Sequence, residues 1–137
     1  MHLIAEKRTE SGWEHLPMPE TATDRNYELF AFIAGVRSHY YMGPPLAEGR
    51  GLPPDLNWEQ AIAHEDGEGD DEAYTIRDFF EDDGHSATWL LCSELPVPWS
   101  SGLKLETWTW AWIVWMRAIS KMHGGPGNVR LTIFFDN

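Results

Sequence analysis

Residues 82–89, Asp-Asp-Gly-His-Ser-Ala-Thr-Trp, place a histidine and a serine directly after two carboxylates and a glycine. Serine, histidine and aspartate are the residue types of a nucleophile, its base and an orienting acid. In catalytic triads, however, these groups come from separate segments that converge in the fold. The pair Asp83-Gly84 also favours a turn, with Ser86 at the start of the next element. We therefore rank a turn first, a ligand-binding role for His85 or Ser86 second, and catalysis third.

Arginine side chains gather around a proline- and glycine-rich segment at residues 37–57. Three arginines lie at or near its ends, beside a histidine and two tyrosines; these residues are Arg25, Arg37, Arg50, His39, Tyr40 and Tyr41. Guanidinium groups bind phosphate through paired hydrogen bonds and stack on aromatic rings. The segment is a candidate pocket for a nucleotide-like ligand. Pairing of these arginines with surface carboxylates is an equally good interpretation.

The acidic stretch at 65–72 has the alternating acids of a calcium loop, beginning at Asp66. Such a loop needs glycine at its sixth position and a bidentate acid at its twelfth, and here Asp71 and Arg77 stand there. A solvated acidic surface is therefore favoured. Neither a paired-cysteine motif nor HExxH is present, so no zinc site is expected. We expect no metal and no organic cofactor.

The composition predicts one folded domain over 1–137 with an acidic surface. Hydrophobic residues make up 42% of the chain and aromatic residues 13%, including eight tryptophans, which is typical of a folded protein. Acids outnumber Lys and Arg by 22 to 10, giving a net charge of −12. This charge argues against direct nucleic-acid binding and suits a basic partner.

The single cysteine, Cys92, has no internal disulfide partner. Residues 1–10 lack the apolar centre of a signal peptide, and no apolar run reaches the roughly 18 to 20 residues that span a bilayer. We expect a cytosolic protein without a membrane span.

The N-terminal half predicts a β-hairpin over 2–16 that turns near Gly12. A core helix follows over 25–36, with Thr23 or Asp24 as its N-cap.

The central part of the chain is less regular in pattern. A short helix is expected at 58–65 and a solvated run at 65–72, and residues 74–80 fit a helix or a strand. Residues 86–95 predict a strand that becomes helical near Ser93.

Residues 103–122 form a tryptophan-rich segment that we interpret as a helix at about 105–122. Its apolar stripe consists of Leu105, Trp108, Trp112, Trp115 and Ile119. A strand would place alternate tryptophans on one side, but the length and the cations Arg117 and Lys121 near the end favour a helix. A helix that is apolar nearly all round must be buried on two sides, which suggests a homo-oligomer formed through it.

The last element is a clear strand at 128–135. We expect an α+β fold: a small, mostly antiparallel sheet, made of the N-terminal hairpin and the C-terminal strand, packed against two or three helices.

Three parts of the chain carry motifs in a fixed order. They are RNYELFAFIAGVR at 25–37, GRGLPPD at 49–55 with DGHSATWLLCSEL at 83–95, and VRLTIFFDN at 129–137. Together they resemble a family of small proteins of tailed phages and prophages, with the pattern RNYxLFAxLAxVR, GLPxD, DGHSxSxLTxxEL and VRxxFxFDN. This chain has cysteine where that family has threonine after the leucine, and it lacks an insertion that many members carry after EL.

The resemblance implies a phage accessory protein acting in the host bacterial cytoplasm against antiviral immunity. We favour a non-catalytic binder that sequesters a nucleotide-derived immune signal, because the matching segments are rich in basic and uncharged polar groups. The candidate ligand-binding residues are Arg25, Asn26, Tyr27, Arg50, His85 and Ser86. The two arginines would contact phosphate, the tyrosine would stack, and the asparagine and histidine would form hydrogen bonds.

Two alternatives remain open. The first is an acidic, anti-CRISPR-like inhibitor that mimics nucleic acid and blocks a basic host defence protein through residues 65–72 and 81–83. The second is a phosphodiesterase that uses His85 to cleave such a signal.

Overall fold

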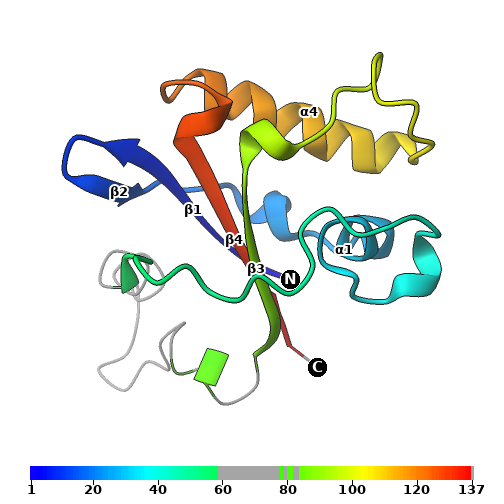
Figure 1. Ribbon diagram of the computed structural model, residues 1–137, viewed down its shortest axis with the longest axis horizontal. Coiled ribbons are helices and arrows are strands. Elements are labelled where there is room, and N and C mark those ends of the chain that lie inside the picture. Colours follow the sequence, from blue (N-terminus) through cyan, green and yellow to red (C-terminus); the bar gives the residue numbers. More distant parts are fainter. Residues whose placement is uncertain (59–77, 79, 82–83, 137) are drawn as a thin grey trace.

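The computed structural model describes residues 1–58, 78, 80–81 and 84–136. Its centre is a four-stranded antiparallel sheet in the order β2 (Gly12–His15), β1 (His2–Thr9), β4 (Val129–Phe135) and β3 (His85–Leu91). Among the described residues, two α-helices, α1 (Tyr27–Ala34) and α4 (Thr107–Lys121), accompany the sheet (Figure 1). The strands come from both ends and the middle of the chain. The predicted α+β class, with an antiparallel sheet packed against helices, is confirmed.

The N-terminal hairpin consists of β1 (His2–Thr9) and β2 (Gly12–His15), as the sequence predicts. The turn closes at the pair Thr9 and Gly12. Gly12 has a φ of +121°, which only glycine adopts readily.

The central strand β4 (Val129–Phe135) lies between β1 and β3 (His85–Leu91). All seven residues of β4 are buried, which shows that both faces of the sheet are covered. Both predicted strands, and the helical turn at 92–94 that follows β3, are confirmed.

One face of the sheet packs against both helices. Near the end of β4 the ring centroids of Phe30 and Phe135 are 5.1 Å apart. The main apolar cluster joins Leu131 and Ile133 of β4 to Ile33 of α1 and to Ile113 of α4. Burial of this cluster is the main source of folding free energy.

Helix α1 spans Tyr27–Ala34 and is shorter than predicted. Its N-cap is Asn26, whose Oδ1 accepts a hydrogen bond from Leu29 N at 3.1 Å, so the prediction of Thr23 or Asp24 is wrong. Thr23 ends a separate 3₁₀ turn, where its hydroxyl donates to the Glu20 carbonyl.

Helix α4 spans Thr107–Lys121, close to the predicted limits. The predicted inward stripe is only partly right, because Trp112 is buried but Trp108 is 62% exposed. The buried face instead consists of Thr109, Trp112, Ile113, Met116 and Ser120.

The opposite face of the sheet holds a buried ion pair under the segment 52–58. Arg130 Nε and Nη2 donate to Glu6 Oε1 at 3.1 and 2.7 Å. Arg130 Nη1 donates to Asp55 Oδ1 at 2.6 Å. The Arg130 guanidinium also lies 4.4 Å from the centre of the Trp13 ring. The GLPPD segment is thereby fixed across the sheet.

The proline- and glycine-rich segment after α1 follows an ordered path. Leu46 N and Ala47 N donate to carbonyls at the end of α1, and Gly51 N donates to the Ala87 carbonyl at 3.0 Å. The last of these contacts covers the edge of β3, which would otherwise expose unpaired backbone groups.

Several predictions from the sequence fall almost wholly on residues outside the described ones. They concern the short helix at 58–65, the acidic run at 65–72 with its calcium-like pattern, and the segment 74–80. Among the described residues, no helix is long and apolar enough to cross a bilayer.

Candidate functional site

A cavity of about 320 Å³ lies where the start of α1 meets the ends of β3 and β4. The residues that line it are Met1, Arg25, Tyr27, Phe30, Val36, Arg37, His85, Phe135 and Asp136. Three of the six sequence-predicted site residues, Arg25, Tyr27 and His85, are therefore brought together here, although they come from distant parts of the chain.

The Tyr27 ring is flanked by two guanidinium groups. The Cζ atoms of Arg37 and Arg25 lie 4.4 and 5.9 Å from the centre of the ring. The Tyr40 ring packs against the same tyrosine, with centroids 5.1 Å apart. Cations at such distances are attracted to the ring quadrupole, which orders both arginine side chains at the cavity wall.

The backbone after α1 places Arg37 in this position. Gly35 ends the helix with a φ of +73°, and Arg37 itself has a φ of +55°. For a residue with a Cβ atom this left-handed conformation costs roughly 1–2 kcal/mol. The chain thus reverses sharply and returns the Arg37 side chain to Tyr27.

His85 and Ser86 lie at an irregularity of the edge strand β3. The register with β4 shifts between His85 and Thr88, and Ser86 has a φ of +55°. His85 Nδ1 and Ser86 Oγ are 2.9 Å apart, within hydrogen-bonding distance. A bulge of this kind turns side chains out of the regular strand pattern and is common beside binding sites.

Gly84 shows why a glycine precedes this histidine. A Cβ atom at position 84 would lie 2.7 Å from Phe80 Cα, closer than real side chains approach backbone. Gly84 N also donates to the Phe80 carbonyl at 3.1 Å. The glycine therefore permits a tight turn that delivers His85 to the cavity.

A second cavity of about 410 Å³ adjoins the first, and the two share Val36, Arg37 and His85. Ser86, the fourth predicted site residue, lines this second cavity together with Glu48. The Glu48 carboxylate packs against Gly35, where a Cβ atom would meet its Oε1 at 2.8 Å. The second cavity is consequently less cationic than the first.

Arg25 and Arg37 give the first cavity its positive charge. Among the described residues, neither forms an ion pair with a carboxylate. Asp136 at the rim offsets part of this charge, and its Oδ1 lies 3.8 Å from His2 Nε2. In a chain with a net charge of −12, two guanidiniums that have no carboxylate partner among the described residues favour an anionic ligand.

The structure does not bring Asn26 to either cavity lining. Besides capping α1, its Nδ2 donates to Thr109 Oγ1 at 3.3 Å. Asn26 thereby connects the start of α1 to α4, and its side chain is engaged in holding the two helices together.

Arg50 also lies outside both linings. Its Nη1 and Nη2 donate to Glu94 Oε2 and Oε1 at 2.9 and 2.8 Å, and Nη1 also donates to the Trp89 carbonyl at 3.2 Å. These hydrogen bonds from Arg50 lower the pKa of Glu94, which also accepts from Leu91 N. Three of the five N–H donors of this guanidinium are thus engaged by protein groups.

Arg37 is the cationic residue of the first cavity that was missing from the predicted site. The sequence placed it beside the candidate pocket but gave no reason to prefer it to Arg50. Its left-handed backbone is not signalled by residue type, because arginine rarely adopts that conformation.

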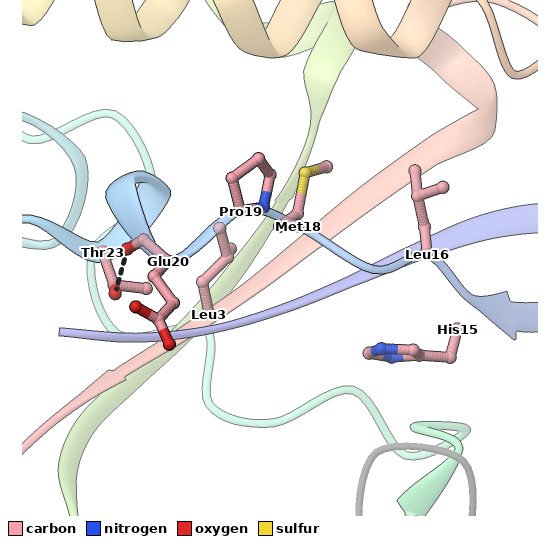
Figure 2. A pocket seen from close by; sticks show the side chains of 7 residues that line it. All are labelled: Leu3, His15, Leu16, Met18, Pro19, Glu20 and Thr23. Atoms are coloured by element: carbon pink, nitrogen blue, oxygen red, sulfur yellow. Dashed lines mark hydrogen bonds between the residues drawn. The ribbon is translucent and has the colours of Figure 1, made fainter. Parts of the chain in front are cut away.

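A third cavity, also about 320 Å³, lies beside β1 and the chain that follows β2. Figure 2 shows that Leu16 and His15 point to opposite sides of this segment. The Thr23 hydroxyl donates to the Glu20 carbonyl at 2.9 Å. Among the described residues, no arginine or lysine lines it, and Glu20 adds negative charge. It suits an anion less well than the cavity at Arg25 and Arg37.

The first cavity combines groups that are suited to holding an anionic, partly aromatic ligand. His85 Nδ1 and Ser86 Oγ are in contact, and no hydrogen bond between His85 and a carboxylate is found in the part of the chain that is described. A serine nucleophile needs its base to be oriented by a third group. The cavity does offer two cations, an aromatic ring and hydrogen-bonding groups.

The chain matches no known protein family, no curated protein and no solved structure in comparisons with each.

Proposed function

We propose that this chain binds a small phosphorylated, nucleotide-like molecule in the two adjoining cavities and holds it without chemical change. The observation that carries the proposal is the pair Arg25 and Arg37, which flank Tyr27 at the cavity wall without carboxylate partners among the described residues. Paired guanidiniums of this kind recognise phosphate, and the aromatic rings supply a stacking surface for a base.

Each of the two cavities binds a different part of such a ligand. The phosphate occupies the first cavity against Arg25 and Arg37. The polar edge of the ligand reaches His85 and Ser86 at the boundary. In the second cavity the Glu48 carboxylate accepts hydrogen bonds from sugar hydroxyls, which a carboxylate does in many nucleotide sites. Asn26 and Arg50 support the site from outside.

The biological role proposed here follows from the resemblance to phage proteins. A phage protein that holds a nucleotide-derived immune signal in the host bacterial cytoplasm would lower the free concentration of that signal. Binding without turnover is sufficient for this role, which agrees with a cavity that has binding groups but no oriented nucleophile among the described residues. The protein would then act as a sponge for the signal.

The experiment begins with protein purified from bacteria that express nucleotide-signalling defence systems. Native mass spectrometry before and after heat release would identify any bound molecule. Arg37→Gln is expected to lose it, whereas Arg50→Gln removes the same charge outside the cavities and is expected to retain it. Isothermal titration with the released compound, or with a panel of cyclic and linear nucleotides, would then give the affinities.

The outcomes separate the three functional classes. An intact ligand that depends on Arg37 supports sequestration. A ligand recovered as cleaved product, with cleavage lost in His85→Ala, supports the phosphodiesterase. Protein that is empty and binds none of the panel argues against the cavity and favours the acidic inhibitor, whose residues 65–72 lie outside the described ones.

A further inference from the structure

The outer face of α4 carries a row of apolar side chains that are mostly exposed in the described part of the chain. Trp108 is 62% exposed and Met122, just after the helix, is 79% exposed. Between them lie Ala111, Trp115 and Ala118, of which the two alanines are exposed and the tryptophan is half-buried. The spacing along these five residues is three, four, three and four, which is the spacing of a helix seam that packs on another helix.

Two hollows flank this seam and differ in charge. The hollow near the start of α4, about 470 Å³, is lined by Trp108 and Trp115 and includes Asp24. The hollow near its end, about 270 Å³, includes Arg117 and Lys121. One end of the face is therefore acidic and the other end is basic.

We propose that this face is a self-association surface that pairs, antiparallel, with the same face of a second copy. In that arrangement Ala111 of each copy lies opposite Ala118 of the other, so the helices can approach closely. Trp108 packs against Met122 of the other copy, and Trp115 lies near the two-fold axis. A two-fold pairing of identical patches is the commonest way in which soluble proteins form oligomers.

The charges at the two ends of the face favour a second copy of the chain as the partner and an antiparallel arrangement of the two α4 helices. Two chains with a net charge of −12 repel each other, so a shared face must be poor in acids. Antiparallel pairing brings the basic end, at Lys121, to Asp24 at the acidic end of the other copy. Parallel pairing would bring like charges together at both ends.

The surface is separate from the proposed ligand site, because none of its residues lines the cavities at Arg37. Self-association can therefore be tested independently of ligand binding. A single helix pair with flanking tryptophans makes a small interface, so we expect dissociation in roughly the micromolar range.

Light scattering after size-exclusion chromatography tests the association between about 5 and about 200 µM protein. The expected mass rises towards twice the chain mass of 15.7 kDa. Ala111→Glu and Met122→Glu each place a carboxylate on the face and are expected to weaken association at least ten-fold. Met42→Glu is the matched control, because it changes an exposed methionine outside α4 and should leave association unchanged.

A monomer over the whole concentration range overturns the proposal, as does a dimer that Ala111→Glu leaves intact. Circular dichroism verifies that each variant is folded. Disulfide formation in the folded dimer then tests the orientation. Val114→Cys lies near the two-fold axis of an antiparallel pair and is expected to cross-link in oxidised glutathione, whereas Met122→Cys is not. The reverse pattern would indicate a parallel pair and contradict the charge argument.

Discussion

The guanidinium of Arg37 lies 4.4 Å from the centre of the Tyr27 ring, although the two residues stand at opposite ends of α1. The contact exists because Gly35 and Arg37 both adopt left-handed backbone conformations and reverse the chain. Strain of this kind persists only where surrounding contacts hold it, and it concentrates at binding sites. A second strained residue, Ser86, lines the adjoining cavity.

The strain at Ser86 predicts that Ser86→Gly stabilises the protein. Glycine removes the cost of a φ of +55° but adds flexibility to the unfolded chain, so we expect a net gain of about 0.5 kcal/mol. Ser93→Gly is the control, because Ser93 has an ordinary negative φ, and it should lower stability instead. Urea unfolding followed by tryptophan fluorescence gives both values. A loss in Ser86→Gly as large as that in Ser93→Gly would show that position 86 stores no strain.

The two Arg-Glu pairs of the fold predict very different effects for the same substitution. Glu6 is fully buried beside Arg130, so Glu6→Gln leaves an undercompensated buried guanidinium. We expect a loss of about 3 kcal/mol in the free energy of unfolding. Glu94→Gln breaks the half-exposed pair with Arg50 and should cost about 0.5 kcal/mol.

Chemical denaturation of both variants at neutral pH measures this difference. Equal losses in the free energy of unfolding would mean that burial does not determine how much these ion pairs contribute to stability. A loss under about 1 kcal/mol in Glu6→Gln would mean that Asp55 alone compensates Arg130.

Local patterns in the sequence were sufficient for the four strands, for the presence of α1 and α4, and for the fold class. The 3.6-residue periodicity gave α1 and α4, and the β-branched run gave β4. The cap of α1 was misjudged because three suitable residues, Thr23, Asp24 and Asn26, stand close together. The preceding 3₁₀ turn includes Thr23 and has Asp24 as its C-cap, so Asn26 is the residue that stands directly before the first helical position.

The orientation of α4 and the composition of the site depend on contacts between distant residues. Aromatic side chains surround so much of α4 that periodicity cannot decide which side faces the sheet. Contacts with distant residues fix it: Trp112 Nε1 donates to the Ala22 carbonyl at 2.9 Å, and Asn26 Nδ2 donates to Thr109 Oγ1 at 3.3 Å. Similarly, Arg37 and Arg50 are equivalent by sequence, and only the pairing of Arg50 with Glu94, 44 residues away, removes it from the cavity.

The thiol of Cys92 is predicted to be inert in the folded protein. Burial raises its pKa to about 12, although Arg117 and Ser120 oppose this shift. At pH 8 the thiolate fraction is then about a thousand-fold smaller than in an unfolded chain. Reaction with a chromogenic disulfide reagent should be slower by that factor in buffer than in guanidinium chloride. Ser93→Cys places a thiol at the exposed neighbouring position and should react rapidly in both. Rapid reaction of the native Cys92 would contradict its burial.

Two carboxylates make the fold sensitive to acid in a defined direction. Hydrogen bonds from Arg130 lower the pKa of Asp55, and hydrogen bonds from Arg50 lower that of Glu94. A carboxylate whose pKa is lower in the folded state contributes stability above its ordinary pKa. That contribution is lost as the pH falls through the folded pKa, since the unfolded chain takes up protons first.

The double variant Asp55→Asn with Glu94→Gln isolates this contribution from the other carboxylates. At pH 7 the variant should be less stable than the natural chain, because both charged hydrogen bonds are weakened. Between about pH 5 and about pH 3 the natural chain should lose more stability than the variant, so that the two curves converge. Urea denaturation at a series of pH values measures both curves. Curves that stay parallel down to about pH 3 would show that neither carboxylate is held in its charged form by its arginine.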